Sequence, residues 1–402
     1  MADISIWQFP LSVAAAAAFL GGLFLLWRFL PDGLLRRTLS GMRLCLGTTV
    51  AVIVLMAVEG SWGFPVHRSW PFFAVALLLM LSLGFTTLDA LERKARFSYL
   101  ATHLGFFILA AGTFWGAPDV VDCSLAVSGE QAVSVAMDRE GRAVELPFSI
   151  RLVGFRTEYY EDGTSPKQYS SDLELDGQGA STSVNHPCRK NGYSIYQMDY
   201  DRASGRYSVL KLVRDPWLPL IFLGMLLMAA GAVASLGTVW DSWKVLLAAL
   251  AVAALFAAFS LARINFGTLM PALRSLWFVP HLLLYMLAYS ALALALVFLI
   301  LRRDRLSGRL FATSSALLLL GMLCGAVWAK AAWGDWWTWD AKECWAAVTW
   351  LLTLTGLHVP AGTRRRRTAV AICMILAFLA MQITWYGVDW LPASQMSLHS
   401  YR

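Results

Sequence analysis

The sequence predicts a polytopic α-helical membrane protein with about ten transmembrane helices and one small extracytoplasmic β-rich domain. Hydrophobic residues make up 58% of the 402 residues and charged residues only 15%, which is the composition of a membrane protein. Apolar runs long enough to cross about 30 Å of hydrocarbon recur along the chain. A polar segment at 117–214 interrupts these runs, and its alternating pattern is typical of β-strands.

Ten apolar runs are predicted to cross the membrane as helices. They lie near residues 10–30, 43–60, 70–90, 98–116, 216–237, 244–262, 281–301, 310–330, 345–361 and 367–386. The first is expected to be a helix rather than a signal peptide, because no basic residue precedes it. The domains that follow are membrane helices at 1–116, the β-rich domain at 117–214, a further helix and linker at 215–243, and a second membrane domain at 244–402 with a loop at 331–345.

Basic loops predict the orientation of these helices. Lysine and arginine gather after the first, third, seventh and ninth runs, so these loops alternate correctly along the chain and are expected in the cytoplasm. The residues are Arg36, Arg37, Arg43, Arg93, Lys94, Arg96, Arg302, Arg303, Arg305, Arg309 and Arg364 to Arg367. Both termini and segment 117–214 then face the outer side of the cell inner (cytoplasmic) membrane. The loops also explain the net charge of +7, so membrane lipid is an expected partner and nucleic acid is not.

Segment 117–214 is expected to form one modest β-rich core. Short alternating runs such as 148–155 and 193–196 lie between clusters of Gly, Asp and Ser. Cys123 and Cys188 both fall in this segment, so a disulfide and two separate thiols are equally open. The six cysteines of the chain form no C-x-x-C pair, and the sequence therefore carries neither a thioredoxin-like dithiol nor a zinc ribbon.

The stretch from Trp333 to Glu343 has the most unusual composition in the chain. Its four tryptophans are Trp333, Trp336, Trp337 and Trp339, and its charged residues are Asp335, Asp340, Lys342 and Glu343. Tryptophan also anchors helices at membrane interfaces, so an aromatic belt is the alternative. A belt requires neither these charges nor a glycine. We interpret the stretch as a flat aromatic platform with a charged rim, suited to a large, planar, partly charged ligand.

Two histidines are predicted to lie at matching depth near the cytoplasmic side. His103 lies seven residues after Arg96 and His358 six before Arg364, which places both roughly 9–10 Å inside the boundary. A histidine within a membrane helix is costly and usually faces a polar partner or a cofactor. Each could instead be a packing histidine bonded to a neighbouring helix, but the matching depth favours a shared ligand.

Two further histidines bracket the Trp-rich stretch on the outer side. His281 opens the seventh run, and His399 follows the tenth in a short C-terminal tail. They could be two interfacial histidines. They could also ligate a metal whose flat surround rests on the tryptophans, and haem iron with two axial histidines fits this arrangement. His67 and His186 lie in outer loops and are expected to be ordinary surface or turn residues.

Several motifs resemble known haem-handling proteins. The stretch 333–340, followed by Lys342-Glu343 and Thr349-Trp350, resembles the WWD signature of cytochrome c biogenesis. The segments similar to the CcsA (ResC) branch are 271–281, 357–358, 387–391 and 398–401, and those similar to the CcsB (ResB) partner are 102–105, 184–187, 192–197 and 213–216. The partner half precedes the WWD half, which is the order of the fused System II synthases, CcsBA.

The resemblance implies a role for each candidate site residue. His103 and His358 would hold haem b within the membrane on a route from the cytoplasm. His281 and His399 would be its axial ligands at the outer site, above the WWD tryptophans. Lys342 could meet a haem propionate, while Asp340 and Glu343 could orient Lys342 or only pair with it.

The implied reaction is covalent attachment of haem to a Cys-x-x-Cys-His segment of apocytochrome c on the outer face. Haem carries the reactive vinyl groups, and the protein would supply orientation and electrostatics. The apocytochrome thiols must be reduced, which implies a separate thioredoxin-like reductant. No catalytic acid or base is identifiable. The alternatives are a haem exporter or chaperone without ligation activity, a bis-histidine electron-transfer subunit, and a transporter unrelated to haem.

Overall fold

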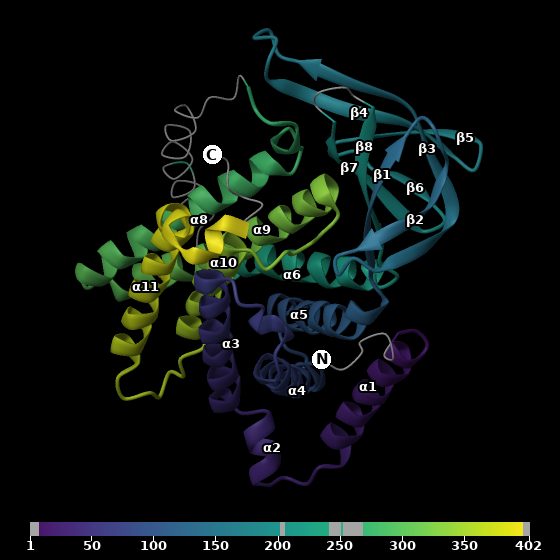
Figure 1. Cartoon of the computed structure of the whole chain (residues 1–402). Helices are drawn as coiled ribbons and strands as arrows, with labels where there is room; N and C mark the ends of the chain where they lie inside the picture. The colour runs from purple at the N-terminus through teal and green to yellow at the C-terminus, as the bar shows by residue number, and fades with distance from the viewer. Residues whose placement is uncertain (1–7, 202–205, 241–250, 252–267, 397–402) are drawn as a thin grey trace.

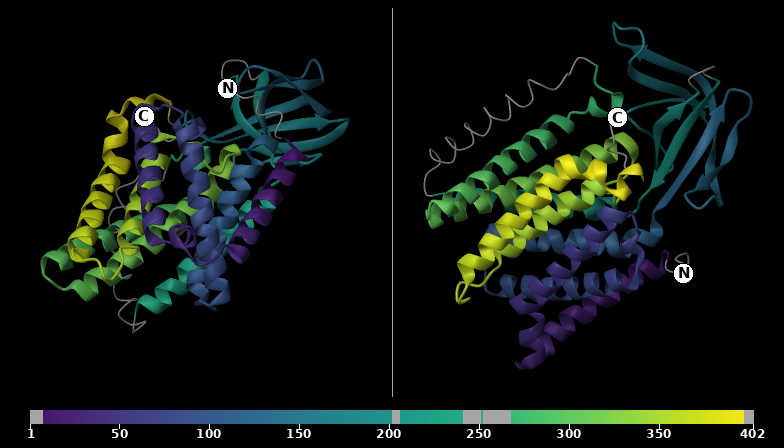
Figure 2. Two further views of the ribbon diagram at one scale, coloured as in Figure 1. Left: turned by 90° about the horizontal axis from the view of Figure 1, so that it is seen from below. Right: turned by 60° about the vertical axis from the view of Figure 1, so that its left-hand side comes forward.

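The protein is a bundle of long helices with a single antiparallel sheet at one end (Figure 1). This computed structural model describes residues 8–201, 206–240, 251 and 268–396. The right-hand view of Figure 2 shows the helices extending away from the sheet side by side. The architecture confirms the predicted class, an α-helical membrane protein with one small β-rich domain.

Nine of the ten predicted runs correspond to helices in the described part of the chain. The long helices are α1 (Leu11–Phe29), α3 (Met42–Trp62), α4 (Trp70–Glu92), α5 (Phe97–Gly116), α6 (Leu218–Val239), α8 (Phe278–Ile300), α9 (Asp304–Trp333), α10 (Ala341–Leu357) and α11 (Arg366–Gln382), with a short α2 (Leu34–Leu39). Eight helical segments among the described residues are long and apolar enough to cross a membrane, and α10, with 17 residues, is shorter. The predicted run at 244–262 lies outside the described residues.

The helix ends nearest the sheet are marked by specific residues. Gly63 caps the C-terminus of α3 and Gly334 that of α9, both with a left-handed backbone (φ of 74° and 86°) that glycine adopts without strain. Ser69 caps α4 by accepting a hydrogen bond from the Phe72 N–H. Asp340 caps α10 in the same way. The polar loops at this end are therefore defined by local sequence signals.

Helices α5 and α6 approach each other closely through glycines. A Cβ atom on Gly105 would lie 2.6 Å from the Met228 nitrogen, and one on Gly224 would lie 2.7 Å from the Leu109 nitrogen. Small residues at such crossings allow membrane helices to pack backbone against backbone. This contact joins the helix that precedes the sheet to the helix that follows it, and it fixes the position of α5, which carries His103.

The sheet has eight antiparallel strands in the order β5-β4-β3-β2-β1-β8-β7-β6. Their bounds are β1 (Val121–Ser128), β2 (Val133–Asp138), β3 (Ala143–Tyr159), β4 (Pro166–Leu175), β5 (Gln178–Ser183), β6 (Cys188–Lys190), β7 (Tyr193–Tyr200) and β8 (Tyr207–Arg214). The sheet curls so that β4 and β5 face β7. Ser171 donates to the Gln197 side chain at 2.6 Å, and Thr182 donates to the Ile195 carbonyl at 2.8 Å. The apolar face is enclosed as one core.

The two cysteines of the sheet lie too far apart to form a disulfide. Cys123 pairs with Leu212, Leu212 with Ile195, and Ile195 with Cys188, so the cysteines occupy one row across four strands. Three strand spacings amount to about 14 Å, whereas a disulfide joins Cα atoms less than about 7 Å apart. Both thiols are free. The question left open by the sequence is thereby answered in favour of two separate thiols.

Candidate functional site

The Trp-rich stretch is divided between a short loop and two helices. Helix α9 ends at Trp333 and α10 begins at Ala341, so the loop proper is 334–340 and shorter than the predicted 331–345. We call 334–340 the WWD loop. The difference arises because Gly334 and Asp340 terminate the flanking helices closer together than hydropathy indicates.

Ion pairs attach the start of the WWD loop to the sheet. Asp335 accepts hydrogen bonds from the Lys211 ammonium at 2.6 Å and from the Arg139 guanidinium at 3.0 Å. Asp122 completes the group, 3.5 Å from Lys211 and paired with Arg139. Lys211 is only 8% exposed. Burial opposes the charged form of Arg139, but Asp335 and Asp122 outweigh it and raise the pKa of the guanidinium.

Close packing reinforces this attachment at Gly334. A Cβ atom there would lie 2.9 Å from the Tyr196 ring and 3.0 Å from the Val213 side chain, and the backbone is left-handed. A side chain at this position would push the loop away from β7 and β8. Asp335 is therefore best understood as an anchor between the loop and the β-rich domain.

The carboxylates at the other end of the loop stabilise the start of α10. Asp340 accepts a hydrogen bond from the Glu343 N–H at 2.9 Å, and Glu343 accepts from the N–H and hydroxyl of Thr338 at 2.6 and 3.0 Å. Such a cap contributes about 1 kcal/mol. Lys342 lies in the first turn of the helix and is half-buried. Both carboxylates thus make local hydrogen bonds at the start of α10, and their expected relation to Lys342 stays a prediction.

The tryptophans are packed edge to face rather than as the flat platform expected from the sequence. Trp337 and Trp339 have ring planes at 84°, and Trp333 meets Trp328 of α9 at 72°. Edge-to-face contacts match the charge distribution of aromatic rings. The ring of Trp336 lies 5.7 Å from the Lys330 ammonium. Among the described residues, the buried indole N–H groups of the loop and the first turns of α10 that have no hydrogen-bond partner are those of Trp336, Trp337 and Trp345.

His281 lies in the first turn of α8, and aromatic contacts connect it to the end of α9 that precedes the WWD loop. Its Nδ1 is 2.9 Å from the Gly321 carbonyl, and because a carbonyl only accepts, Nδ1 carries the hydrogen. Nε2 then holds the lone pair that a metal requires. The imidazole lies 5.7 Å from the Trp328 ring, which in turn contacts Trp333 at 5.2 Å. The second predicted outer ligand, His399, lies outside the described residues.

His103 and His358 are brought together at the far end of the bundle. Their ring centres are 6.1 Å apart, and roughly 6 Å separates two imidazoles that share one metal ion. Each Nδ1 lies 2.8 Å from the carbonyl four residues earlier in its helix, Tyr99 for His103 and Leu354 for His358. Both rings therefore present Nε2 with its lone pair, as His281 does.

His67 contacts the WWD loop, which the sequence analysis did not predict. It lies in a turn, as expected, but it is half-buried, and its ring stacks on Trp339 with centres 4.6 Å apart and planes at 7°. Its Nδ1 is 2.5 Å from the carboxylate of Glu59. No local signal marks this contact, since residues 67 and 339 are far apart in the sequence. His186, by contrast, lies exposed in a turn, as expected.

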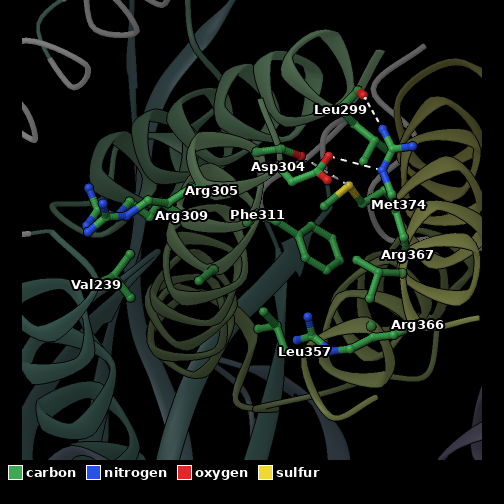
Figure 3. Close-up of a pocket in the computed structure, with 15 residues that line it drawn as sticks. Val239, Leu299, Asp304, Arg305, Arg309, Phe311, Leu357, Arg366, Arg367 and Met374 are labelled. Atoms are coloured by element: carbon green, nitrogen blue, oxygen red, sulfur yellow. Dashed lines mark hydrogen bonds and ion pairs between the residues drawn. The ribbon is translucent and has the colours of Figure 1, made fainter. Parts of the chain in front are cut away.

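A cavity of about 590 Å³ lies at the end of the bundle away from the sheet (Figure 3). Phe311 and Met374 contribute apolar surface to it, and Arg367 is bound to the Asp304 carboxylate and the Leu299 carbonyl, both at 3.1 Å. Its walls come from the ends of α6, α8 and α10 and the beginnings of α9 and α11, and include neither predicted histidine of this end of the bundle. It is therefore separate from the histidine pair.

The histidines at these sites suit a metal whose other ligands come from a bound group rather than from the protein. In the part of the chain that the structure describes, no group of three or more His, Cys, Asp or Glu side chains is placed to hold a metal ion. Histidines in pairs cannot complete the shell of a bare ion such as zinc, which takes four ligands. Haem iron needs only one or two axial ligands from the protein.

Comparisons with known proteins identify two families in this chain. The model of the ResB-like family matches residues 92–209, and that of the cytochrome c assembly proteins matches 217–395, which includes α6. Cytochrome c biogenesis protein CcsA of Prochlorococcus marinus (strain MIT 9312) is 34% identical over 180 residues, 34% of this chain and 57% of the relative. CcsA of Oryza sativa is 40% identical over 103 residues, 26% of this chain and 31% of the relative.

The chain thus spans about a third to somewhat over half of the length of these curated relatives. Its own organisation is nevertheless specific, because a ResB-like segment and a cytochrome c assembly segment follow one another in a single polypeptide. Both segments belong to a multi-pass helical membrane protein. The chain is therefore a member of the fused CcsBA (ResB–ResC) proteins of System II cytochrome c biogenesis.

Proposed function

We propose that this chain is a holocytochrome c synthase that moves haem b across the cytoplasmic membrane and attaches it to apocytochrome c on the outer face. The observation that carries the proposal is that three histidines have the same tautomer, with the hydrogen on Nδ1. His103, His358 and His281 each donate Nδ1–H to a backbone carbonyl and so present Nε2 for an axial bond to iron. His103 and His358 would hold haem within the membrane, and His281 with His399 would hold it beside the WWD loop.

The attachment adds two cysteine thiols across the two vinyl groups of haem. In each addition a sulfur–carbon bond forms, the S–H bond breaks, and its hydrogen passes to the other vinyl carbon, so no net oxidation occurs. Two axial imidazoles would keep the iron closed until the substrate histidine replaces one of them. The buried indole N–H donors of Trp336, Trp337 and Trp345 are groups that a haem carboxylate could satisfy. A thioredoxin-like protein would keep the thiols reduced.

The contact between the β-rich domain and the WWD loop favours a synthase over a haem exporter. A carrier needs a haem site but has no evident need for a second domain bound to that site. Here Lys211 and Arg139 of the sheet bind Asp335 of the loop. An apocytochrome docked on the sheet would therefore lie next to the haem.

Expression of the chain with an apocytochrome, in cells that lack their own maturation system, tests the proposal. We expect covalent haem to stay on the cytochrome in a denaturing gel. Haem-loaded protein without thioether bonds would instead identify an exporter. Tightly retained haem that cycles between redox states would identify an electron-transfer subunit, and purified protein without haem would contradict all three haem functions.

A further inference from the structure

The corner between α3 and α4 is the part of the N-terminal helices that reaches the WWD loop. It includes Glu59 near the end of α3 and His67 in the short helix η2 (Val66–Arg68). Both family matches begin later in the chain, at residues 92 and 217, so neither assigns a role to this corner. Close packing holds it against α10, because a Cβ atom on Gly60 would lie 2.8 Å from the Cβ of Cys344.

A buried carboxylate fixes the imidazole of His67. Glu59 is only 4% exposed, although a carboxylate is rarely buried without partners. One of its oxygens accepts a hydrogen bond from the backbone N–H of His67 at 2.9 Å, and the other lies 2.5 Å from Nδ1. These two bonds determine both where the residue lies and how its ring is turned.

The fixed ring supports Trp339 in an uncommon backbone conformation. Trp339 has a φ of +62°, which bulky residues rarely adopt and which persists only where surrounding contacts determine it. Its indole lies parallel to the His67 ring, 4.6 Å away, and meets the edge of Phe72 at 5.3 Å. Its carbonyl accepts a hydrogen bond from the Cys344 thiol. Most of these contacts come from the α3–α4 corner.

We propose that Glu59 and His67 are positioning residues that hold Trp339 as one wall of the outer haem site. The inference rests on the proposed function, since it assigns the wall to haem. Glu59 sets the imidazole, the imidazole face sets the indole, and the indole contacts Trp337 at the centre of the loop. The N-terminal helices thereby take part in haem binding through their contact with Trp339, whereas the sheet contacts the loop at Asp335.

The test uses the full-length chain purified in detergent and co-expressed with an apocytochrome. His67→Gln keeps a hydrogen-bonding group for Glu59 but removes the ring. We expect it to lower outer-site haem and holocytochrome yield by roughly two- to tenfold, the effect of one aromatic contact. A double variant, Glu59→Leu with His67→Phe, places a ring against Trp339 without the hydrogen bond between carboxylate and imidazole, and it should recover most of the yield. Arg68→Ala, in the same turn and exposed, is the matched control and should behave as the wild type.

Imidazole separates a positioning residue from an iron ligand. Added imidazole should restore His281→Ala but should have no effect on His67→Gln, because the latter lacks a supporting ring rather than an axial ligand. Wild-type yield in His67→Gln, restoration of that variant by imidazole, or failure of the double variant to recover would each overturn the inference. If the wild-type chain itself attaches no haem, the proposed function fails instead, and the two failures are thus distinguished.

Discussion

The two ends of the helix bundle hold their candidate site residues by different means. Away from the sheet, His103 and His358 each bond to a carbonyl four residues earlier, and glycine packing between α5 and α6 fixes the helix that carries His103. Near the sheet, the WWD loop is held by partners distant in sequence. Arg139 lies 196 positions from Asp335, and Lys211 lies 124 positions away. One end depends on helix packing and the other on contacts between domains.

The largest effect is expected from removing the histidine pair away from the sheet. His103→Ala combined with His358→Ala takes away both proposed ligands of the inner haem, so haem at the outer site and holocytochrome yield should both fall to background. The absorbance spectrum of the purified protein and haem staining of the cytochrome measure this result. His186→Ala, in an exposed turn of the sheet, provides a histidine control. Unchanged outer-site haem in the double variant would refute a route through this pair.

A change in helix packing should damage the far end more than the loop end. Gly224→Leu places a side chain where backbone atoms of α5 lie 2.7 Å from a Cβ, so we expect a loss of about 3 kcal/mol in unfolding free energy. Thermal unfolding in detergent should show the loss, and the haem signal of the inner pair should weaken. Gly22→Leu in α1 meets no atom within 4 Å of its Cβ and is the matched control. Equal melting temperatures for the two variants would contradict the packing argument.

Removing the anchor of the WWD loop should instead affect the loop end more than the far end. Asp335→Ala deprives Lys211 and Arg139 of a shared partner, although Asp122 remains. We therefore expect the free energy of unfolding to fall by about 1–2 kcal/mol. Outer-site haem should fall while the inner pair keeps its spectrum. Asp138→Asn, which interrupts a pair with the exposed Arg142 on the same sheet, should change neither. A loss of inner haem in Asp335→Ala would show that the two ends are not held independently.

The smallest effect is expected from the two thiols of the sheet. Burial raises the pKa of both Cys123 and Cys188 to about 11, so both stay protonated at pH 8. Alkylation by iodoacetamide should be slow in the folded protein at pH 8 and fast after unfolding. Because the folded-state pKa is raised, the buried neutral thiols contribute to the free energy of unfolding. That contribution is complete below the ordinary thiol pKa of about 8.5 and is lost as the pH rises towards 11. Rapid alkylation at pH 8 without unfolding would contradict the burial of both thiols.

Much of the fold follows from local patterns in the sequence. Hydropathy places the helices to within a few residues, because a membrane span requires a continuous apolar run. The alternation of apolar residues predicts the β-rich domain between α5 and α6. The depth argument also pairs His103 with His358, since both positions are measured from basic loops at the same end of the bundle. Each of these inferences depends on residues close together in the chain.

The remainder depends on contacts that no local pattern contains. The stack of His67 on Trp339, the ion pairs of Asp335 and the separation of Cys123 from Cys188 all join segments far apart in sequence. The sequence alone determined a helical membrane protein with a β-rich domain, its WWD stretch and its candidate histidines. Only the tertiary structure decided what holds the WWD loop, because an indole face or a carboxylate becomes a support when a distant segment packs against it.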